Sequence, residues 1–141
     1  MTAISEISLA IEQEFLALPD WEQRTRRLLD FGRQLPDMDS ILKVEDNRVT
    51  GCQSQVWIAG GYDAAAGIVR LQAASDALIV RGLIALLLRL YSDQPPDTIL
   101  AHSPDVFERI GLSTSLSPSR ANGLYLMVKR IRELAAREGG S

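Results

Sequence analysis

Apolar residues recur at three- and four-residue intervals in four long stretches of the chain, and this spacing is typical of one face of an α-helix. The predicted helices cover residues 4–18, 21–35, 76–91 and 118–138. Asp20, Ser75 and Ser117 are suited to cap the starts of the last three. Asp76 then lies in the first turn of the third, where the helix dipole favours an anion. That third stretch is apolar on nearly every side, which predicts a buried central helix.

Two shorter stretches have the character of β-strands. Val56–Tyr62 is rich in β-favouring residues, and Ile68–Ala74 alternates apolar with polar positions. Because the connection between them is short, they are expected to pair as an antiparallel hairpin. Residues 44–50 predict a short edge strand beside them. Helices before and after a sheet of about three strands predict an α+β fold in a single domain, residues 1–141, with the helices covering one face of the sheet.

Glycine and arginine residues inside the helices add two expectations. Gly82 lies in the interior of the third helix, where glycine costs about 1 kcal/mol relative to alanine. We expect it to permit close approach of another backbone, that of the sheet. Arg24, Arg26 and Arg27 are expected to form a solvated face of the second helix.

Composition and charge narrow the function classes. The chain has 141 residues, is 46% hydrophobic and carries a formal net charge of −3. This charge disfavours nucleic-acid binding, which needs basic residues to neutralise phosphates. The most apolar run, residues 78–91, is interrupted by Arg81 and Arg89 and is too short to span a bilayer. Since the N-terminus also lacks the pattern of a signal peptide, we expect a cytoplasmic protein without a membrane partner.

The chain contains one cysteine, Cys52, and one histidine, His102. A single thiol excludes an intramolecular disulfide and a CxxC redox pair. A structural zinc site needs about four such ligands, so no metal is expected. A Cys–His catalytic pair would have to use His102, which is far from Cys52 in the sequence and in a turn-rich stretch. Nothing in the pattern supports that pair.

Cys52 lies on a predicted loop immediately before the first strand. Gly51 permits unusual backbone angles, and the residues around the thiol are polar. An isolated cysteine is more often a small buried hydrophobic residue, but a thiol that serves packing would fit better inside the alternating strand. With neither a second thiol nor a base nearby in the sequence, the chemistry that remains is exchange of sulfur with a partner molecule.

Three segments of the sequence resemble the SufE family of sulfur-acceptor proteins. The first is Asn47-Arg48-Val49-Thr50-Gly51-Cys52-Gln53-Ser54-Gln55-Val56-Trp57. The others are residues 75–83, at the entrance to the central helix, and residues 116–124, at the entrance to the last helix. They occur in the family's order, and the similarity extends from about Trp21 to about Arg132. The chain is therefore identified as similar to SufE over nearly its whole length.

The resemblance implies a fold, a function and partners. The fold would be the one that SufE shares with IscU-type scaffolds. Cys52 would accept persulfide sulfur from a SufS-like cysteine desulfurase, activate that enzyme, and deliver the sulfur to a SufB- or SufBCD-like scaffold for iron–sulfur cluster assembly. Pyridoxal phosphate belongs to the desulfurase, so no cofactor is expected here. A homodimer is left open.

The resemblance also assigns site residues beside the acceptor Cys52. The residues expected to form its movable loop are Gly51, Gln53, Ser54 and Gln55. The residues expected to stabilise a sulfur anion or to dock the partner are Asp76, Arg120 and Asn122. For all three, a local helix-entrance role is an equal alternative.

Several rival functions stay open at this stage. A sister branch of the family, CsdE-like, serves another desulfurase, although Gln53-Ser54-Gln55 favours SufE itself. A single-cysteine redox protein would use the same thiolate without a sulfur donor. An interaction domain with an inert Cys52 is the third rival. A cluster scaffold is disfavoured because it needs several thiolate ligands.

Overall fold

The computed structural model describes residues 3–139. The elements in chain order are α1 (Ile4–Leu16), α2 (Trp21–Gln34), the 3₁₀ turns η1 (Ser40–Leu42) and η2 (Glu45–Asn47), β1 (Val56–Asp63), β2 (Ile68–Ser75), α3 (Leu78–Tyr91), α4 (Pro96–Ala101), α5 (Asp105–Arg109), α6 (Leu112–Ser115) and α7 (Pro118–Gly139). No helix among these is both long enough and apolar enough to cross a membrane.

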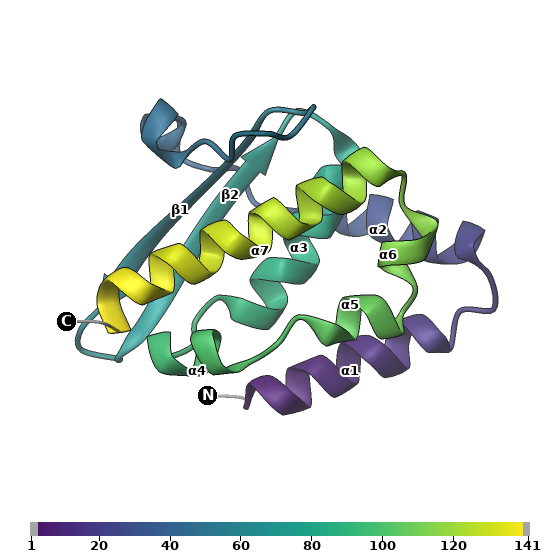
Figure 1. The fold of residues 1–141 in the computed structure, drawn as a ribbon, viewed down its shortest axis with the longest axis horizontal. Helices are drawn as coiled ribbons and strands as arrows, with labels where there is room; N and C mark the ends of the chain where they lie inside the picture. The colour runs from purple at the N-terminus through teal and green to yellow at the C-terminus, as the bar shows by residue number, and fades with distance from the viewer. Residues whose placement is uncertain (1–2, 140–141) are drawn as a thin grey trace.

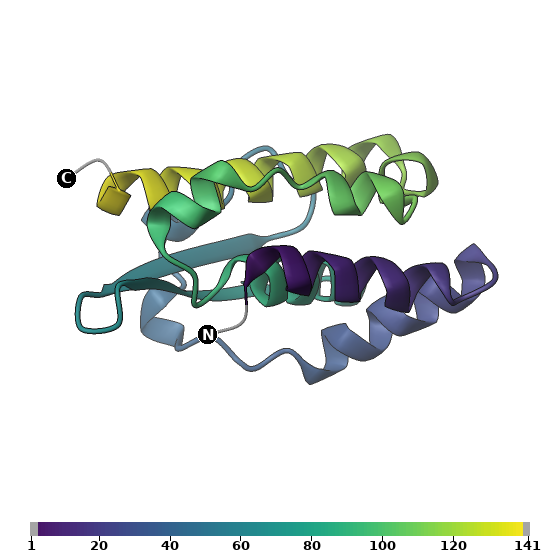
Figure 2. The same ribbon diagram turned by 90° about the horizontal axis from the view of Figure 1, so that it is seen from below.

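The antiparallel hairpin β1–β2 lies against the helices on one face (Figure 1). In β2, Val69, Leu71 and Ala73 are buried, whereas Arg70 and Gln72 between them are exposed. This alternation is the one expected of a half-buried strand. Figure 2 shows α7 in the upper layer and α2 in the lower one, with the hairpin at intermediate height. The predicted α+β fold is therefore confirmed, with the core between the hairpin, α3 and α7.

The expected third strand is wrong for the described residues, because residues 44–50 contain the turn η2 instead. Within residues 3–139 the sheet is extended only by single bridges, Arg48 with Trp57 at one edge and Val69 with Gln94 at the other. Side chains explain the difference in the first segment. Asn47 donates its Nδ2 hydrogen to the carbonyl oxygen of Leu42 at 2.8 Å, a local bond that favours a turn over an extended strand.

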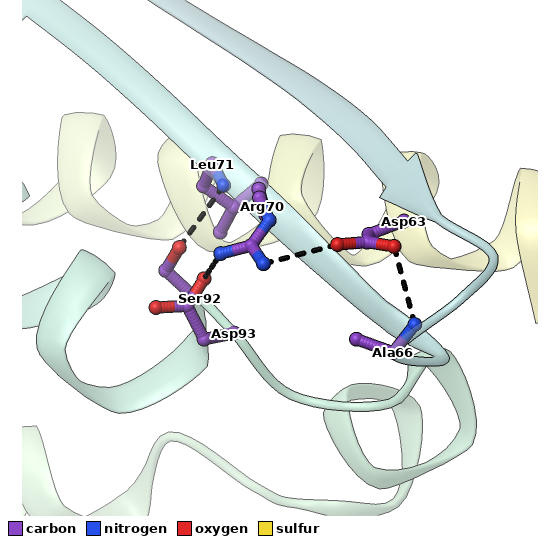
Figure 3. Close-up of polar contacts among 6 residues, drawn as sticks. All are labelled: Asp63, Ala66, Arg70, Leu71, Ser92 and Asp93. Carbon is purple, nitrogen blue, oxygen red and sulfur yellow. Dashed lines mark hydrogen bonds and ion pairs between the residues drawn. The ribbon is translucent and has the colours of Figure 1, made fainter. Parts of the chain in front are cut away.

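The second edge of the hairpin is covered by the turn that follows α3. Ser92 accepts a hydrogen bond from the Leu71 backbone N–H at 3.0 Å, and Arg70 pairs with Asp63 and Asp93 at 3.0 and 3.4 Å (Figure 3). The two ion pairs are exposed, so each contributes little free energy. They nevertheless connect the start of β2 to the end of β1 and to the turn that follows α3.

The close backbone approach at Gly82 is made to α2, not to the sheet. A Cβ added to Gly82 would lie 2.7 Å from the carbonyl carbon of Leu28 and closer still to its oxygen. Gly32 on α2 makes the reciprocal contact, since its Cβ would lie 2.5 Å from the oxygen of Leu78. These two glycines let α2 and α3 pack closely.

Of the three residues predicted to cap helix starts, Asp20 and Ser117 do so in the structure. Asp20 accepts a hydrogen bond from the Gln23 N–H at 2.8 Å, and Ser117 accepts one from the Arg120 N–H at 3.3 Å. The third case differs, because α3 begins at Leu78 with Ala77 as its N-cap, and Asp76 therefore precedes the helix.

The arginines of α2 are not simply a solvated face. Arg24 donates hydrogen bonds to the carbonyl oxygens of Leu18 and Ile110, and Arg27 pairs with Glu14 of α1 at 2.8 Å. Arg26 does remain exposed.

Candidate functional site

Cys52 lies on a loop, residues 49–55, that joins η2 to β1. The loop is closed at its base, where the Val49 N–H donates a hydrogen bond to the carbonyl oxygen of Val56 at 2.8 Å. Gly51 has a φ of +91°, a backbone angle that side chains disfavour. A Cβ there would also lie 3.0 Å from Cδ1 of Leu126 in α7. Glycine is therefore favoured at this position by its backbone conformation, and a larger residue would also displace the end of the Leu126 side chain.

The thiol of Cys52 is half-buried against the first turns of α7. A Cβ on Gly123 would lie 3.6 Å from its Sγ, so the sulfur rests directly over this glycine. Beside it is a cavity of about 210 Å³ between the loop, α3 and α7. The residues that line it are Cys52, Gln53, Ser54, Val56, Val80, Leu83, Ser117, Ser119, Arg120, Gly123 and Met127. The thiol thus faces a small space whose walls combine apolar and hydroxyl-bearing side chains with one glutamine and one arginine.

Burial raises the pKa of the Cys52 thiol above its ordinary value. Desolvation disfavours the charged thiolate, so at neutral pH the sulfur is mostly protonated and weakly nucleophilic in this conformation. A loop that moved into solvent would lose this desolvation, and the pKa would fall toward that of an ordinary thiol. The nucleophilicity of the Cys52 thiol therefore depends on how deeply the loop buries it.

We expect the pH profile of Cys52 alkylation to reflect this burial. Because a raised pKa leaves less thiolate at any given pH, the rate with iodoacetamide should rise at higher pH in the folded protein than in the urea-unfolded chain, where the midpoint should be about 8.5. With one cysteine in the chain, the mass of the product reports this thiol alone. A folded-state midpoint equal to or below the unfolded one would contradict the effect of burial.

Asp76 holds the C-terminal end of the Cys52 loop. Its Oδ1 accepts a hydrogen bond from the Gln55 N–H at 3.0 Å, and its own N–H donates to the Gln55 carbonyl oxygen at 3.3 Å. The sequence placed Asp76 in the first turn of a helix, whereas its carboxylate is directed at the loop. The contact depends on the fold, which brings the end of β2 beside the start of β1.

The structure places the two predicted residues of α7 differently. Arg120 lines the cavity, and within residues 3–139 its guanidinium has no hydrogen-bond or ion-pair partner. Asn122 is exposed and is not among the residues that line the cavity. His102 lies between α4 and α5, where its carbonyl oxygen accepts a hydrogen bond from the hydroxyl of the buried Tyr91 at 3.1 Å. His102 is also not part of the cavity wall.

Arg130 is a residue of the site region that sequence reasoning missed. Its guanidinium donates hydrogen bonds to the carbonyl oxygens of Ile58 and Asp46 and to Oδ1 of Asn47, at 3.1 to 3.2 Å. These acceptors lie on the two chain segments that flank the Cys52 loop. No group of three or more metal-binding side chains is found in the described part of the chain.

Comparisons with known proteins bear on the family and the fold of the chain. A family model named SufE, described as an Fe-S metabolism associated domain, matches residues 9–135. An uncharacterised SufE-like protein of Rhizobium etli is 42% identical over 128 residues, which are 89% of this chain and 86% of that protein. One of Rhizobium meliloti is 38% identical over 138 residues, 96% of each chain. The solution structure of a hypothetical protein from Thermus thermophilus shares the fold, with a TM-score of 0.80, 23% identity, and coverage of 99% of this chain and 100% of that one.

Proposed function

This chain belongs to the SufE family of iron–sulfur metabolism, and on that premise we propose that Cys52 accepts persulfide sulfur from a cysteine desulfurase. One observation carries the proposal. The only thiol of the chain lies on a loop whose glycine adopts a left-handed conformation, with its sulfur beside a small cavity. A scaffold places a reactive group on such a loop when the group must meet another molecule.

The proposed reaction moves one sulfur atom without net oxidation. The Cys52 thiolate attacks the terminal sulfur of the desulfurase persulfide, a new S–S bond forms, and the S–S bond of the donor breaks. The desulfurase cysteine leaves as a thiolate, and Cys52 becomes a persulfide. In the second step a nucleophile on the acceptor protein attacks the terminal sulfur of this persulfide, and Cys52 leaves as a thiolate. The sulfur is cargo, so the protein needs no bound cofactor for the transfer.

Loop geometry supports a cycle between a half-buried thiol and an exposed one. The bonds between Asp76 and Gln55 hold one end of the loop, and Leu126 contacts it at Gly51. A raised pKa keeps the half-buried thiol unreactive, and exposure on a partner would remove the desolvation that raises it. In this proposal Gln53, Ser54 and Gln55 move with Cys52, and Asp76 releases them.

Arg120 is the residue that we assign to the persulfide anion. Arg120 is exposed and is one of the residues that line the cavity beside Cys52, and no ion pair of its guanidinium is found within residues 3–139. A nearby cation stabilises a thiolate or persulfide anion and would favour retention of the sulfur once it has been accepted. Asn122 is exposed on another face of α7, so any role in this proposal would be in docking.

The wider role follows from the same reaction. By removing the sulfur, the protein frees a SufS-like desulfurase for another turnover and thus activates it. It then delivers the sulfur to a SufB- or SufBCD-like scaffold. A peroxide-sensing thiol fits less well, because sensor cysteines combine a low pKa with exposure, whereas burial raises the pKa of Cys52.

Intact mass spectrometry tests the proposal. The protein is mixed with a cysteine desulfurase and free cysteine, and its mass is measured before and after treatment with a reductant. We expect a gain of about one sulfur atom that the reductant reverses. A protein that gains no sulfur, and that leaves the rate of cysteine turnover unchanged, is not an acceptor for that desulfurase.

A further inference from the structure

Three residues on one face of α7, Gly123, Leu126 and Arg130, lie along the Cys52 loop from its tip to its base. Gly123 lies under the Cys52 sulfur, Leu126 contacts the position of Gly51, and Arg130 reaches the chain segments below the loop. Residues spaced by three and four positions share one face of a helix, so this stripe is continuous. The helix thus supports the loop from its tip to its base.

Arg130 joins the two segments at that base. Its Nε and Nη2 each lie 3.2 Å from the carbonyl oxygen of Ile58, in β1. Its Nη2 also lies 3.1 Å from the carbonyl oxygen of Asp46 and 3.2 Å from Oδ1 of Asn47, in η2. The residues between these acceptors contain the whole loop. One guanidinium therefore bonds to the chain both before and after Cys52.

The chemistry of the side chain suits this task. Arginine offers five N–H donors in a planar arrangement, so one residue can bond to acceptors on two segments, which the single ammonium of lysine does less well. Arg130 is half-buried, and hydrogen bonds from a charged donor are stronger than those between neutral groups. Asn47 is itself held through its bond to Leu42, so the acceptor side is fixed as well.

We propose that Arg130 is a positioning residue that limits opening of the loop to residues 50–55, so that Cys52 leaves its cavity along a defined path. This inference rests on the proposed sulfur transfer for its purpose. The hydrogen bonds of Arg130 on which the inference is based are present whether or not the protein transfers sulfur. The Val49–Val56 bond and the Arg48–Trp57 bridge lie between the held segments and the loop, and they mark where opening stops.

Hydrogen exchange of the Val49 amide and alkylation of Cys52 measure the two consequences. In Arg130→Met the Val49 amide should exchange about tenfold faster, the change that corresponds to loss of a charge-assisted hydrogen bond. Iodoacetamide should modify Cys52 several-fold faster, because a small reagent needs only exposure. Sulfur gain from a limiting amount of desulfurase should instead become slower, because a protein donor needs the thiol in a defined position.

Arg132→Met is the matched control on the same helix. Arg132 also donates to two backbone carbonyl oxygens, those of Leu100 and His102 at 2.8 and 3.4 Å, but near α4 and away from the loop. It should lower overall stability by a similar amount and leave Val49 exchange and Cys52 alkylation unchanged. Equal acceleration by both variants would overturn the proposal, since the effect would then be general destabilisation.

Two further variants keep the test decisive if Arg130→Met does not fold. Asn47→Ala removes one acceptor and should accelerate Val49 exchange by a smaller factor. Arg130→Lys keeps the charge but cannot hold both segments, so it should restore only part of the protection. Full protection in the lysine variant, or unchanged exchange in Asn47→Ala, would refute the two-segment role. Exchange is measured without desulfurase, so a failure of sulfur transfer in the wild type would be a separate result.

Discussion

Cys52→Ser is expected to abolish sulfur gain while the protein stays folded. The hydroxyl of serine is not ionised at neutral pH and cannot take up a sulfur atom as a persulfide, so neither transfer step can occur. The side chain is half-buried and differs by one atom, so the free energy of unfolding should change by about 1 kcal/mol or less. Intact mass and the turnover rate of the desulfurase measure the functional loss.

Urea unfolding provides the control for this variant. An unchanged slope and a nearly unchanged midpoint would show that the fold is retained, so that loss of activity reports the thiol alone. If the serine variant still stimulates the desulfurase fully, then stimulation does not proceed through Cys52. That result would leave the protein as a docking partner without the relay chemistry.

Gly82→Ala is expected to destabilise the protein by about 2 kcal/mol or more, although alanine favours helices. The added Cβ would lie 2.7 Å from the carbonyl carbon of Leu28, which is backbone and cannot rotate away. Helices α2 and α3 would have to move apart, and fully buried residues such as Leu28 and Leu83 would lose packing. The midpoint of urea unfolding measures the effect.

Gly61→Ala is the matched control, since nothing lies within 4 Å of a Cβ at that strand position. It should change the midpoint little, because alanine there meets only open space. A Gly82→Ala protein as stable as the Gly61→Ala protein would mean that α2 and α3 adjust at low cost. The close packing of these two helices would then not be a constraint on the fold.

Local signals in the sequence were sufficient for most of the fold. Each element buries one face, and this produces the apolar spacing in α1, α2, α3 and α7 and the alternation in β2. The caps at Asp20 and Ser117 are predictable because each side chain bonds to a backbone N–H only three residues further along the chain. Both partners of such a short-range interaction lie in the same short stretch of sequence, so the residue pattern is enough to predict it.

Contacts between distant segments explain two of the predictions that were wrong. The local sequence predicts Asp76 in the first turn of a helix, but its carboxylate instead bonds to Gln55, which is 21 residues away and becomes adjacent only when the hairpin forms. The sequence predicts close packing at Gly82 but not its partner, because a glycine inside a helix indicates that another backbone approaches without indicating which one; the partner is α2 and not the sheet. The expected edge strand is wrong for a local reason, because the Asn47 side chain donates to the Leu42 carbonyl oxygen five residues earlier and so favours a turn over extended structure.

The site could be located from the sequence at Cys52 but not assembled from it. The lone thiol, its glycine and its polar neighbours identified the loop, and its role as sulfur acceptor stays a prediction. Arg130 carried a signal that could have been used. It lies three positions after Met127 and four before Leu134, on the buried stripe of α7, where an arginine requires partners. Which carbonyl oxygens it binds required the fold.

A single-turnover transfer tests the central claim most directly. A cysteine desulfurase is loaded with sulfur from cysteine, freed of the remaining cysteine, and mixed with an equal amount of this protein, and both proteins are then weighed over time. The account predicts that the desulfurase loses one sulfur atom while this protein gains one on the peptide that contains Cys52. A desulfurase that keeps its sulfur, with the mass of this protein unchanged, would contradict it.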